Sequence, residues 1–202
     1  MRIAGVVLAG GLSSRMGSDK ASLLLAQKTL LKKAQELLLS LPLKDVFISG
    51  FYDGYRCIID LEKGMGPIGA LYSCEQTLCD DYDAMFIIPV DMPLLNLSVC
   101  QSLLQQSKHH KEGIYYENAL FPLIIPLNSH LKKALTRIFN SDLSCQRSLY
   151  GLLKTLKSHA LKASQEENFY LQNSNTPEQW QRCLTLYSLL KNQRKRNESP
   201  EQ

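Results

Sequence analysis

The residues best suited to bind phosphate lie in one stretch near the N-terminus, Leu8–Lys20. It combines three glycines and several serines with two basic residues, Arg15 and Lys20. Gly10 and Gly11 can let the backbone approach a ligand and adopt positive φ, so that successive N–H groups converge on phosphate oxygens. The apolar run before them predicts a short buried strand. The stretch is therefore predicted to be a phosphate-binding turn at the end of that strand.

Two common phosphate-binding motifs do not fit this stretch. A Walker A loop has four residues between its glycines and then Lys-Ser/Thr, whereas five residues separate Gly11 from Gly17 and Ser-Asp-Lys follows. The dinucleotide pattern G-x-G-x-x-G is absent from this first turn. It does occur at Gly64–Gly69, where an NAD site is an alternative, but Pro67 lacks an N–H that a pyrophosphate would use.

Helices and strands alternate along the first half of the chain. Thr29 precedes leucines spaced three and four apart, which predicts an amphipathic helix that ends at Pro42. Apolar runs at 46–48 and 57–59 predict two strands. This alternation predicts an α/β fold with a parallel sheet between helices, and ligands of such sheets bind at the carboxyl ends of the strands. The residues expected to share that crevice are Gly10, Ser49, Asp60 and Asp91.

The most apolar run of the chain, Ala84–Val90, leads directly to Asp91. A continuous run of this kind predicts a central parallel strand that is covered on both faces. Mg²⁺ is commonly held by one or two carboxylates together with substrate phosphates, so Asp91 is a candidate ligand for Mg²⁺. The alternative is that Asp91 only caps the turn before Pro93.

The second half of the chain contains fewer chemical signals. A helix is predicted over Ser98–Leu104, and strands over Ile114–Tyr116 and Leu120–Pro126. Arg147 could bind a phosphate of a second substrate or could be a surface arginine at the start of a helix. Both interpretations stay open.

A capping box predicts the start of the last helix. Thr176 is a typical N-cap, Pro177 suits the first helical position, and Gln179 lies three residues after the cap. This structural role by itself requires no function.

The composition is that of an ordinary globular protein, with 45% hydrophobic and 21% charged residues. No apolar run approaches the ~18 residues of a membrane helix, and the first strand begins too early for a signal peptide, so a cytoplasmic protein is expected. The six cysteines contain no C-x-x-C pair and the four histidines no ligand spacing. Neither disulfides nor a zinc site is predicted.

Length and charge predict one domain followed by a short tail. The 202 residues suit a single domain with a substantial core. The net charge of +4 includes four basic and two acidic residues within 191–202, so the remaining residues carry only +2 and do not indicate nucleic-acid binding. Residues 191–202 are predicted to be a disordered basic tail.

Four motifs, in order, resemble those of the molybdenum cofactor guanylyltransferases, the molybdopterin-guanine dinucleotide biosynthesis protein A family. The first stretch matches the family's Leu-Ala-Gly-Gly-x-x-x-Arg-Met-Gly-x-Asp-Lys, and residues 66–71 are similar to its Gly-Pro-Leu-Ala-Gly. Residues 91–93 match its metal-binding Asp-x-Pro, and residues 173–177 match its Asn-x-Asn-Thr-Pro. The resemblance extends from Gly5 to about Trp180.

This resemblance implies a three-layer α/β/α fold with a mostly parallel, Rossmann-like nucleotidyltransferase sheet. It implies one domain over about residues 1–190, with a nucleotide-binding half at 1–95 and an acceptor-binding half at 96–190. The implied reaction transfers GMP from GTP to the terminal phosphate of the molybdenum-molybdopterin cofactor, with Mg²⁺, and releases pyrophosphate.

The resemblance also implies residue roles. The implied catalytic residues are Arg15, Lys20 and Asp91. The implied nucleotide-binding residues are Leu8, Ala9, Gly10, Gly11, Lys20, Ser49, Asp60, Gly66 and Pro67. Asp91 would hold the metal, with Asn175 as a second candidate ligand, and the acceptor would contact Arg147, Asn173 and Asn175. For the two asparagines, this interpretation stands beside their structural role before the last helix.

One position departs from the family pattern. Ser49 lies where relatives often have an asparagine that helps to read guanine, so a cytidylyltransferase of the same fold is the alternative, although the Leu-Ala-Gly-Gly form favours GTP. A non-catalytic nucleotide-binding module would be expected to lack Asp91, Arg15 or Lys20, all of which are present. The expected partners are GTP, the molybdopterin cofactor and, transiently, molybdoenzymes or other cofactor-assembly proteins; neither nucleic acid nor membrane is expected.

Overall fold

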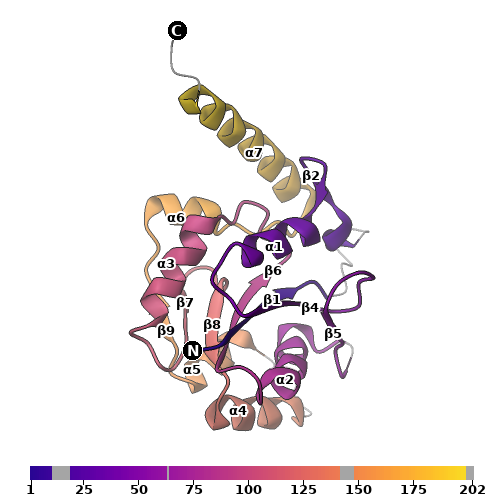
Figure 1. Ribbon diagram of the computed structural model, residues 1–202, viewed down its shortest axis with the longest axis vertical. Coiled ribbons are helices and arrows are strands. Elements are labelled where there is room, and N and C mark those ends of the chain that lie inside the picture. The colour runs from indigo at the N-terminus through magenta and orange to yellow at the C-terminus, as the bar shows by residue number, and fades with distance from the viewer. Residues whose placement is uncertain (11–18, 63, 142–147, 199–202) are drawn as a thin grey trace.

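A seven-stranded sheet forms the centre of the computed structural model, which describes residues 1–10, 19–62, 64–141 and 148–198 (Figure 1). The strands are β1 (Ile3–Leu8), β4 (Asp45–Ser49), β5 (Cys57–Ile58), β6 (Ala84–Pro89), β7 (Ile114–Tyr116), β8 (Leu123–Pro126) and β9 (His159–Leu161). Their order is β5-β4-β1-β6-β8-β7-β9. The first four are mutually parallel, β8 is antiparallel to β6 and β7, and β9 is parallel to β7.

Strands β1 and β6 form the buried centre of this sheet. All six residues of β1 are buried, as its apolar sequence predicts. β6 is parallel to β1 on one side but antiparallel to β8 on the other. The prediction of a central strand that is covered on both faces is confirmed, but its parallel pairing holds only on the side of β1. An apolar run of this kind has the same composition whether its neighbours are parallel or antiparallel.

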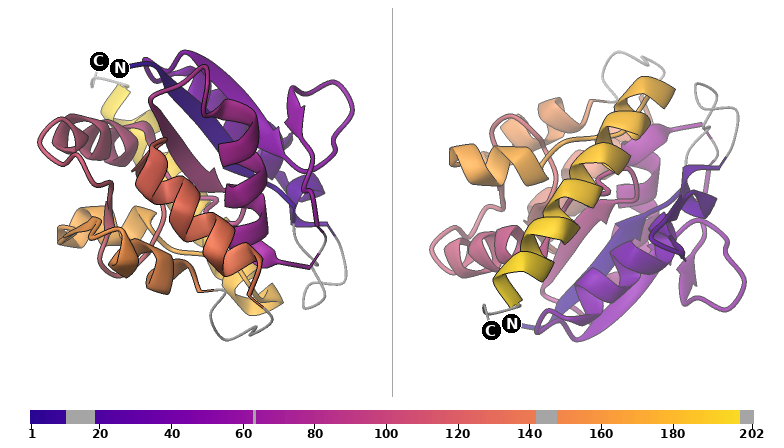
Figure 2. Two further views of the ribbon diagram at one scale, coloured as in Figure 1. Left: turned by 90° about the horizontal axis from the view of Figure 1, so that it is seen from below. Right: turned by 90° about the horizontal axis from the view of Figure 1, so that it is seen from above.

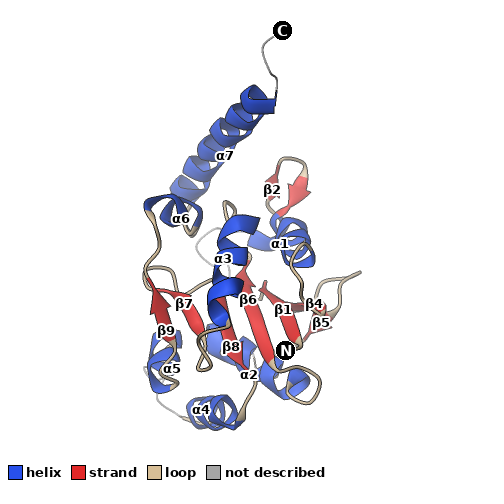
Figure 3. Cartoon of the chain, turned by 60° about the vertical axis from the view of Figure 1, so that its left-hand side comes forward, coloured by secondary structure: helices blue, strands red, loops and turns tan. Residues whose placement is uncertain are grey.

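Helices cover both faces of the sheet, which confirms the three-layer α/β architecture (Figures 1 and 3). Seen from below, α2 and α4 lie over the sheet, and seen from above α7 crosses the opposite side (Figure 2). The helices are α1 (Leu30–Leu39), α2 (Gly66–Leu78), α3 (Leu97–Ser107), α4 (Ser129–Phe139), α5 (Leu149–Thr155), α6 (Gln165–Tyr170) and α7 (Pro177–Glu198). A 3₁₀ turn, η1 (Lys20–Ser22), and a small hairpin of β2 (Leu24–Leu25) and β3 (Lys28–Thr29) precede α1.

Helix α1 shows how the sequence pattern produces this packing. The Thr29 hydroxyl accepts a hydrogen bond from the Lys32 N–H at 3.1 Å and caps the helix. The buried side chains of α1 are Leu30, Leu31 and Leu38, one apolar face of the helix. The amphipathic helix predicted after Thr29 is therefore confirmed.

The last helix differs from its prediction at the C-terminal end. The capping box is present, because the Gln179 side chain accepts from the Thr176 N–H at 3.2 Å and the Thr176 hydroxyl accepts from the Gln179 N–H at 3.3 Å. α7 then continues to Glu198 and projects from the body (Figure 1), whereas the sequence predicted disorder from residue 191. Lys, Arg, Gln and Glu favour helix, and propagation of an existing helix is easier than nucleation.

Within the described residues, no helix is both long and apolar enough to cross a membrane.

Candidate active site

Three polar side chains meet at the carboxyl end of β6. The Lys20 ammonium nitrogen lies 2.6 Å from Asn175 Oδ1 and 3.5 Å from Asp91 Oδ2. The Lys20 and Asp91 side chains are only 15% and 22% exposed. These residues come from the first turn, the end of β6 and the segment before α7, so the fold brings together three separate sequence motifs. We call Lys20, Asp91 and Asn175 the charged cluster.

Backbone contacts hold the charged cluster in place. The Ser174 N–H donates to the Asp91 carbonyl at 2.8 Å, and the Asn175 N–H donates to the Gln179 side chain at 2.7 Å. The segment before α7 is thus fixed both to the turn after β6 and to the helix that it starts. Asn175 therefore belongs to the cluster and also helps to start the helix. Asn173 is exposed, and no described residue links its side chain to the cluster.

Burial makes the Asp91 carboxylate dependent on a nearby cation. Burial raises the pKa of Asp91, and the Lys20 ammonium opposes that shift only in part. Ser174, whose N–H donates to the Asp91 carbonyl, is 2% exposed, and its hydroxyl has no hydrogen-bond partner among the described residues. Buried polar atoms of this kind normally bind a ligand or water. The cluster therefore has charge available for a ligand, and the hydroxyl of Ser174, next to Asn175 in the chain, has an unused hydrogen-bonding capacity.

A second group of residues lies at the carboxyl ends of β4 and β5. The buried Ser49 hydroxyl donates to Asp60 Oδ1 at 3.2 Å. A Cβ atom placed on Gly10 would lie 3.3 Å from Asp60 Oδ2, so the end of β1 also reaches this carboxylate. Of the four residues expected to share one crevice, Gly10, Ser49 and Asp60 lie together, whereas Asp91 contacts Lys20 in the charged cluster. Because Ser49 is 0% exposed and its hydroxyl donates a hydrogen bond to Asp60, its role here is to orient that carboxylate.

The structure corrects the expected conformation of Gly10. The N–H groups of Ala9 and Gly10 both donate to the Ser49 carbonyl, at 3.2 and 2.9 Å, so they are not available to bind phosphate. Positive φ is found instead at Gly50, where φ is +113°. A Cβ on Gly50 would lie 3.3 Å from the Gly10 nitrogen, so these glycines allow the ends of β1 and β4 to approach closely. Sequence reasoning missed Gly50.

Other predicted residues have different surroundings. Leu8 is buried in β1, and its carbonyl accepts from the Val90 N–H at 3.0 Å. Gly66 and Pro67 form the first turn of α2, with Gly66 at φ +57°, so the G-x-G-x-x-G residues begin a helix. A Cβ on Gly69 would lie 2.4 Å from the Met65 Cβ, which gives that glycine a packing role. The predicted residues outside the described segments are Gly11, Arg15 and Arg147.

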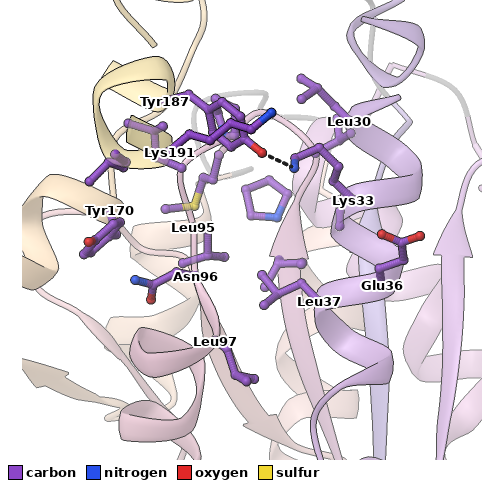
Figure 4. A pocket seen from close by; sticks show the side chains of 18 residues that line it. Leu30, Lys33, Glu36, Leu37, Leu95, Asn96, Leu97, Tyr170, Tyr187 and Lys191 are labelled. Atoms are coloured by element: carbon purple, nitrogen blue, oxygen red, sulfur yellow. Dashed lines mark hydrogen bonds between the residues drawn. The ribbon is translucent and has the colours of Figure 1, made fainter. Parts of the chain in front are cut away.

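A groove of about 430 Å³ lies between α1, the segment after β6, and α7 (Figure 4). Val90 and Met92, which flank Asp91, contribute to its lining, but the three cluster residues do not. Across the groove, Lys33 Nζ lies 3.4 Å from the Tyr187 hydroxyl and 4.9 Å from the centre of its ring. This contact connects α1 to α7, so the groove and the charged cluster share structural elements but are separate sites.

A polar cluster at the carboxyl ends of parallel strands, in an open α/β sheet, is the usual arrangement of a nucleotide-binding enzyme. The family model described as "MobA-like NTP transferase domain" matches residues 5–161. The chain belongs to this family and is a nucleotidyltransferase.

Curated relatives and solved structures agree with this assignment. The chain is 36% identical, over 89% of its length and 93% of the relative's, to the molybdenum cofactor guanylyltransferase of Xanthomonas euvesicatoria pv. vesicatoria. It is 29% identical, over 86% of its length and 92% of the relative's, to a probable molybdenum cofactor guanylyltransferase of Flavobacterium johnsoniae.

The fold is shared more widely. Molybdopterin-guanine dinucleotide biosynthesis protein A of Archaeoglobus fulgidus superposes with a TM-score of 0.68 at 17% identity, covering 92% of this chain and 98% of that chain. CMP:2-keto-3-deoxy-manno-octonic acid synthetase complexed with CTP superposes with a TM-score of 0.64 at 11% identity, covering 94% and 99%. Because the fold occurs in proteins named for different nucleotides, it does not determine which base is bound.

Proposed function

We propose that the protein transfers GMP from GTP to the terminal phosphate of the molybdenum-molybdopterin cofactor, forming the guanine dinucleotide and releasing pyrophosphate. The observation that carries this proposal is the charged cluster, in which Lys20, Asp91 and Asn175 meet although their motifs are far apart in the sequence. The name of the relative at 36% identity supports the choice of substrates.

The residues of the charged cluster suit Mg²⁺. Asp91 and Asn175 offer hard oxygen donors, and Ser174 adds a buried hydroxyl without a partner among the described residues. No group of three His, Cys, Asp or Glu side chains gathers within the described segments, so substrate phosphates and water would complete the coordination. Mg²⁺ bound there would neutralise charge on the phosphates.

Lys20 occupies the oxygens that Mg²⁺ would use. Its ammonium group contacts both Asp91 and Asn175, and a cation cannot bind the same oxygens at the same distance without displacing it. We therefore expect Lys20 to turn from the cluster toward the nucleotide phosphates when nucleotide and metal bind. In the free protein, Lys20 would keep the charge of Asp91 balanced.

The transfer needs no general base from the protein. A phosphate monoester has a second pKa near ~6, so the attacking oxygen is already ionised at neutral pH. The barrier then comes from bringing anions together and from charge on the leaving pyrophosphate, which positioning and positive charge can reduce. Lys20 would bind the phosphates as a point charge, and Arg15 would add a planar donor group.

The choice of base depends on Asp60. Its carboxylate can accept hydrogen bonds from the N–H groups of guanine, whereas Ser49, which donates to Asp60, has no second proton for a base. Because the Ser49 hydroxyl already donates to Asp60 and cannot also donate to guanine, a cytidylyltransferase remains the second candidate.

The protein is further proposed to act in the cytoplasm and to contact molybdoenzymes or other cofactor-assembly proteins transiently, without binding nucleic acid or membrane.

Calorimetry of the purified protein with GTP and with CTP, each with Mg²⁺ and with EDTA, tests this proposal. We expect Mg²⁺-dependent binding of GTP and at least tenfold weaker binding of CTP. An Asp60→Asn variant should reduce the difference between the two nucleotides. A preference for CTP would support the cytidylyltransferase, and binding of neither nucleotide would contradict both.

A further inference from the structure

Tyr52 lies in the loop after β4, and its hydroxyl is surrounded by acceptors from the first turn. Tyr52 Oη lies 3.0 Å from the Ala9 carbonyl oxygen and 3.2 and 3.4 Å from the two carboxylate oxygens of Asp19. Ala9 and Asp19 are on opposite sides of the glycine-rich stretch. One side chain therefore contacts both the segment that leaves β1 and the segment that enters η1.

The position of Tyr52 is well determined by its neighbours. Its N–H donates to the Cys57 sulfur at 3.3 Å, and the Cys57 thiol donates to its carbonyl at 3.2 Å, so the backbone is attached to β5. A Cβ on Gly50 would lie 3.2 Å from the Tyr52 ring, so glycine leaves room for it. Burial and the Asp19 charge raise the pKa of Tyr52 to about 12, so the hydroxyl remains a donor at neutral pH.

Asp19 connects Tyr52 to Lys20, the next residue in the chain. Asp19 Oδ1 accepts from the Ala21 N–H at 3.0 Å, and its carbonyl accepts from the Ser22 hydroxyl at 2.7 Å. These bonds fix Asp19 to the turn η1, whose first residue is Lys20. At the far end of the Lys20 side chain, the ammonium reaches Asn175 and Asp91. The path from the Tyr52 hydroxyl to the charged cluster therefore consists of hydrogen bonds, the peptide unit between Asp19 and Lys20, and the Lys20 side chain.

We propose that Tyr52 is a positioning residue for Lys20, acting through Asp19 and the turn η1. The proposal rests on the proposed function only in naming Lys20 as the residue that binds the transferred nucleotide's phosphates. Tyr52 contacts no reacting atom in this account. The hydrogen bonds of its hydroxyl fix the position of the Lys20 backbone, and this position determines how far the ammonium group can reach.

Tyr82 provides a matched control. Its hydroxyl donates to Asp45 and its pKa is raised to about 12, chiefly by burial, so it resembles Tyr52 chemically. Tyr82 and Asp45 lie at the amino ends of β6 and β4, however, at the opposite edge of the sheet from the charged cluster. Tyr52→Phe and Tyr82→Phe therefore remove the same kind of hydrogen bond at two places, of which one is connected to Lys20.

The first readout is the rate of GMP transfer. Tyr52→Phe should lower kcat about tenfold, as expected for loss of a hydrogen bond to a charged group, with little change in the KM of the acceptor. Tyr82→Phe should leave kcat unchanged. In a Lys20→Met background, Tyr52→Phe should cause no further loss, because its effect passes through Lys20. An equal, additive loss in both backgrounds would overturn the proposal.

A second readout does not depend on the proposed function. Acetic anhydride labelling, followed by mass spectrometry, measures the accessibility of Lys20 relative to the exposed Lys44. Tyr52→Phe should raise Lys20 labelling about fivefold, and Asp19→Ala should do the same from the other side of the contact. Tyr82→Phe should not raise it.

Unchanged Lys20 labelling in both Tyr52→Phe and Asp19→Ala, in protein whose thermal unfolding shows it to be folded, would overturn the proposal. A wild-type protein that transfers no GMP would instead contradict the proposed function, and the labelling result would still test Tyr52.

Discussion

The pKa of an aspartate is shifted in opposite directions at the two ends of the sheet. At the amino ends of the strands, Asp45 accepts from the Tyr82 hydroxyl and lies 2.6 Å from Arg56, and these contacts, that of Tyr82 first, lower its pKa. At the carboxyl ends, burial raises the pKa of Asp91, and Lys20 opposes that shift only in part. The negative charge of Asp45 is thus balanced by groups of the protein, whereas that of Asp91 is balanced only in part, so a cationic ligand could stabilise it further. A difference of this kind is expected between a structural ion pair and a candidate functional site.

The largest effect should come from removing the cation of the charged cluster. Lys20→Met should slow GMP transfer by roughly 10²–10³-fold, by analogy with the loss of one preorganised donor to transition-state charge. Without nucleotide, the same variant should bind Mn²⁺ more tightly, because the ammonium no longer competes for the Asp91 and Asn175 oxygens. Steady-state rates and Mn²⁺ titration by electron paramagnetic resonance measure both effects. Arg56→Met, at the other end of the sheet, is the control and should leave both unchanged; weaker Mn²⁺ binding in Lys20→Met would contradict the account.

Stability against pH should change in opposite directions at the two aspartates. The lowered pKa of Asp45 means that its ionised form stabilises the fold above its unfolded pKa of ~3.9, and that this contribution is lost as the pH falls through the lower folded value. Because the pKa of Asp91 is raised in the folded protein, the fold loses stability as the pH rises from the unfolded pKa of ~3.9 to the higher folded pKa. At pH 7, Asp45→Asn should therefore lower the melting temperature and Asp91→Asn should raise it. Calorimetric melting at pH 7 and pH 3 checks this, and a fall for both variants at pH 7 would remove the contrast.

The smallest effect should come from the cap of α7. Thr176→Ala removes the hydroxyl that accepts from the Gln179 N–H and should lower the free energy of unfolding by about 1 kcal/mol. The Asn175 N–H bond to Gln179 remains, so transfer should slow little in comparison with Lys20→Met. Urea unfolding and transfer rates provide the measurement. A loss of transfer as large as that of Lys20→Met would mean that the cap controls the charged cluster.

The sequence predicted the parts of the site that depend on strand order. Parallel strands place their carboxyl ends together, so the meeting of Gly10, Ser49 and Asp60 follows from the αβ alternation. The motif resemblance implied only that Asn175 lies near the metal that Asp91 would hold. In the structure its Oδ1 lies 2.6 Å from the ammonium of Lys20, 155 positions away, which is a contact that the resemblance did not specify. In both cases the element that carries the residue was recognisable from its own local pattern.

Other features depend on contacts that leave no local pattern. Tyr52 lies in the loop after β4, and only the path of the chain brings its hydroxyl to Asp19. The hydrogen bond from Gly10 to the Ser49 carbonyl extends the pairing of β1 with β4, which composition cannot reveal. The composition of 191–198 suited either a solvated coil or a continued helix, and continuation from α7 decided between them.

The most direct test of the central claim, that the charged cluster is the reaction centre, is the formation of guanine dinucleotide product. Purified wild-type protein and Asp91→Asn would each be incubated with GTP, Mg²⁺ and molybdopterin cofactor, and the product and pyrophosphate quantified by mass spectrometry and a coupled assay. The account predicts equal yields of product and pyrophosphate with the wild type, and a rate at least 10²-fold lower with a folded Asp91→Asn protein. Full activity in Asp91→Asn would contradict it.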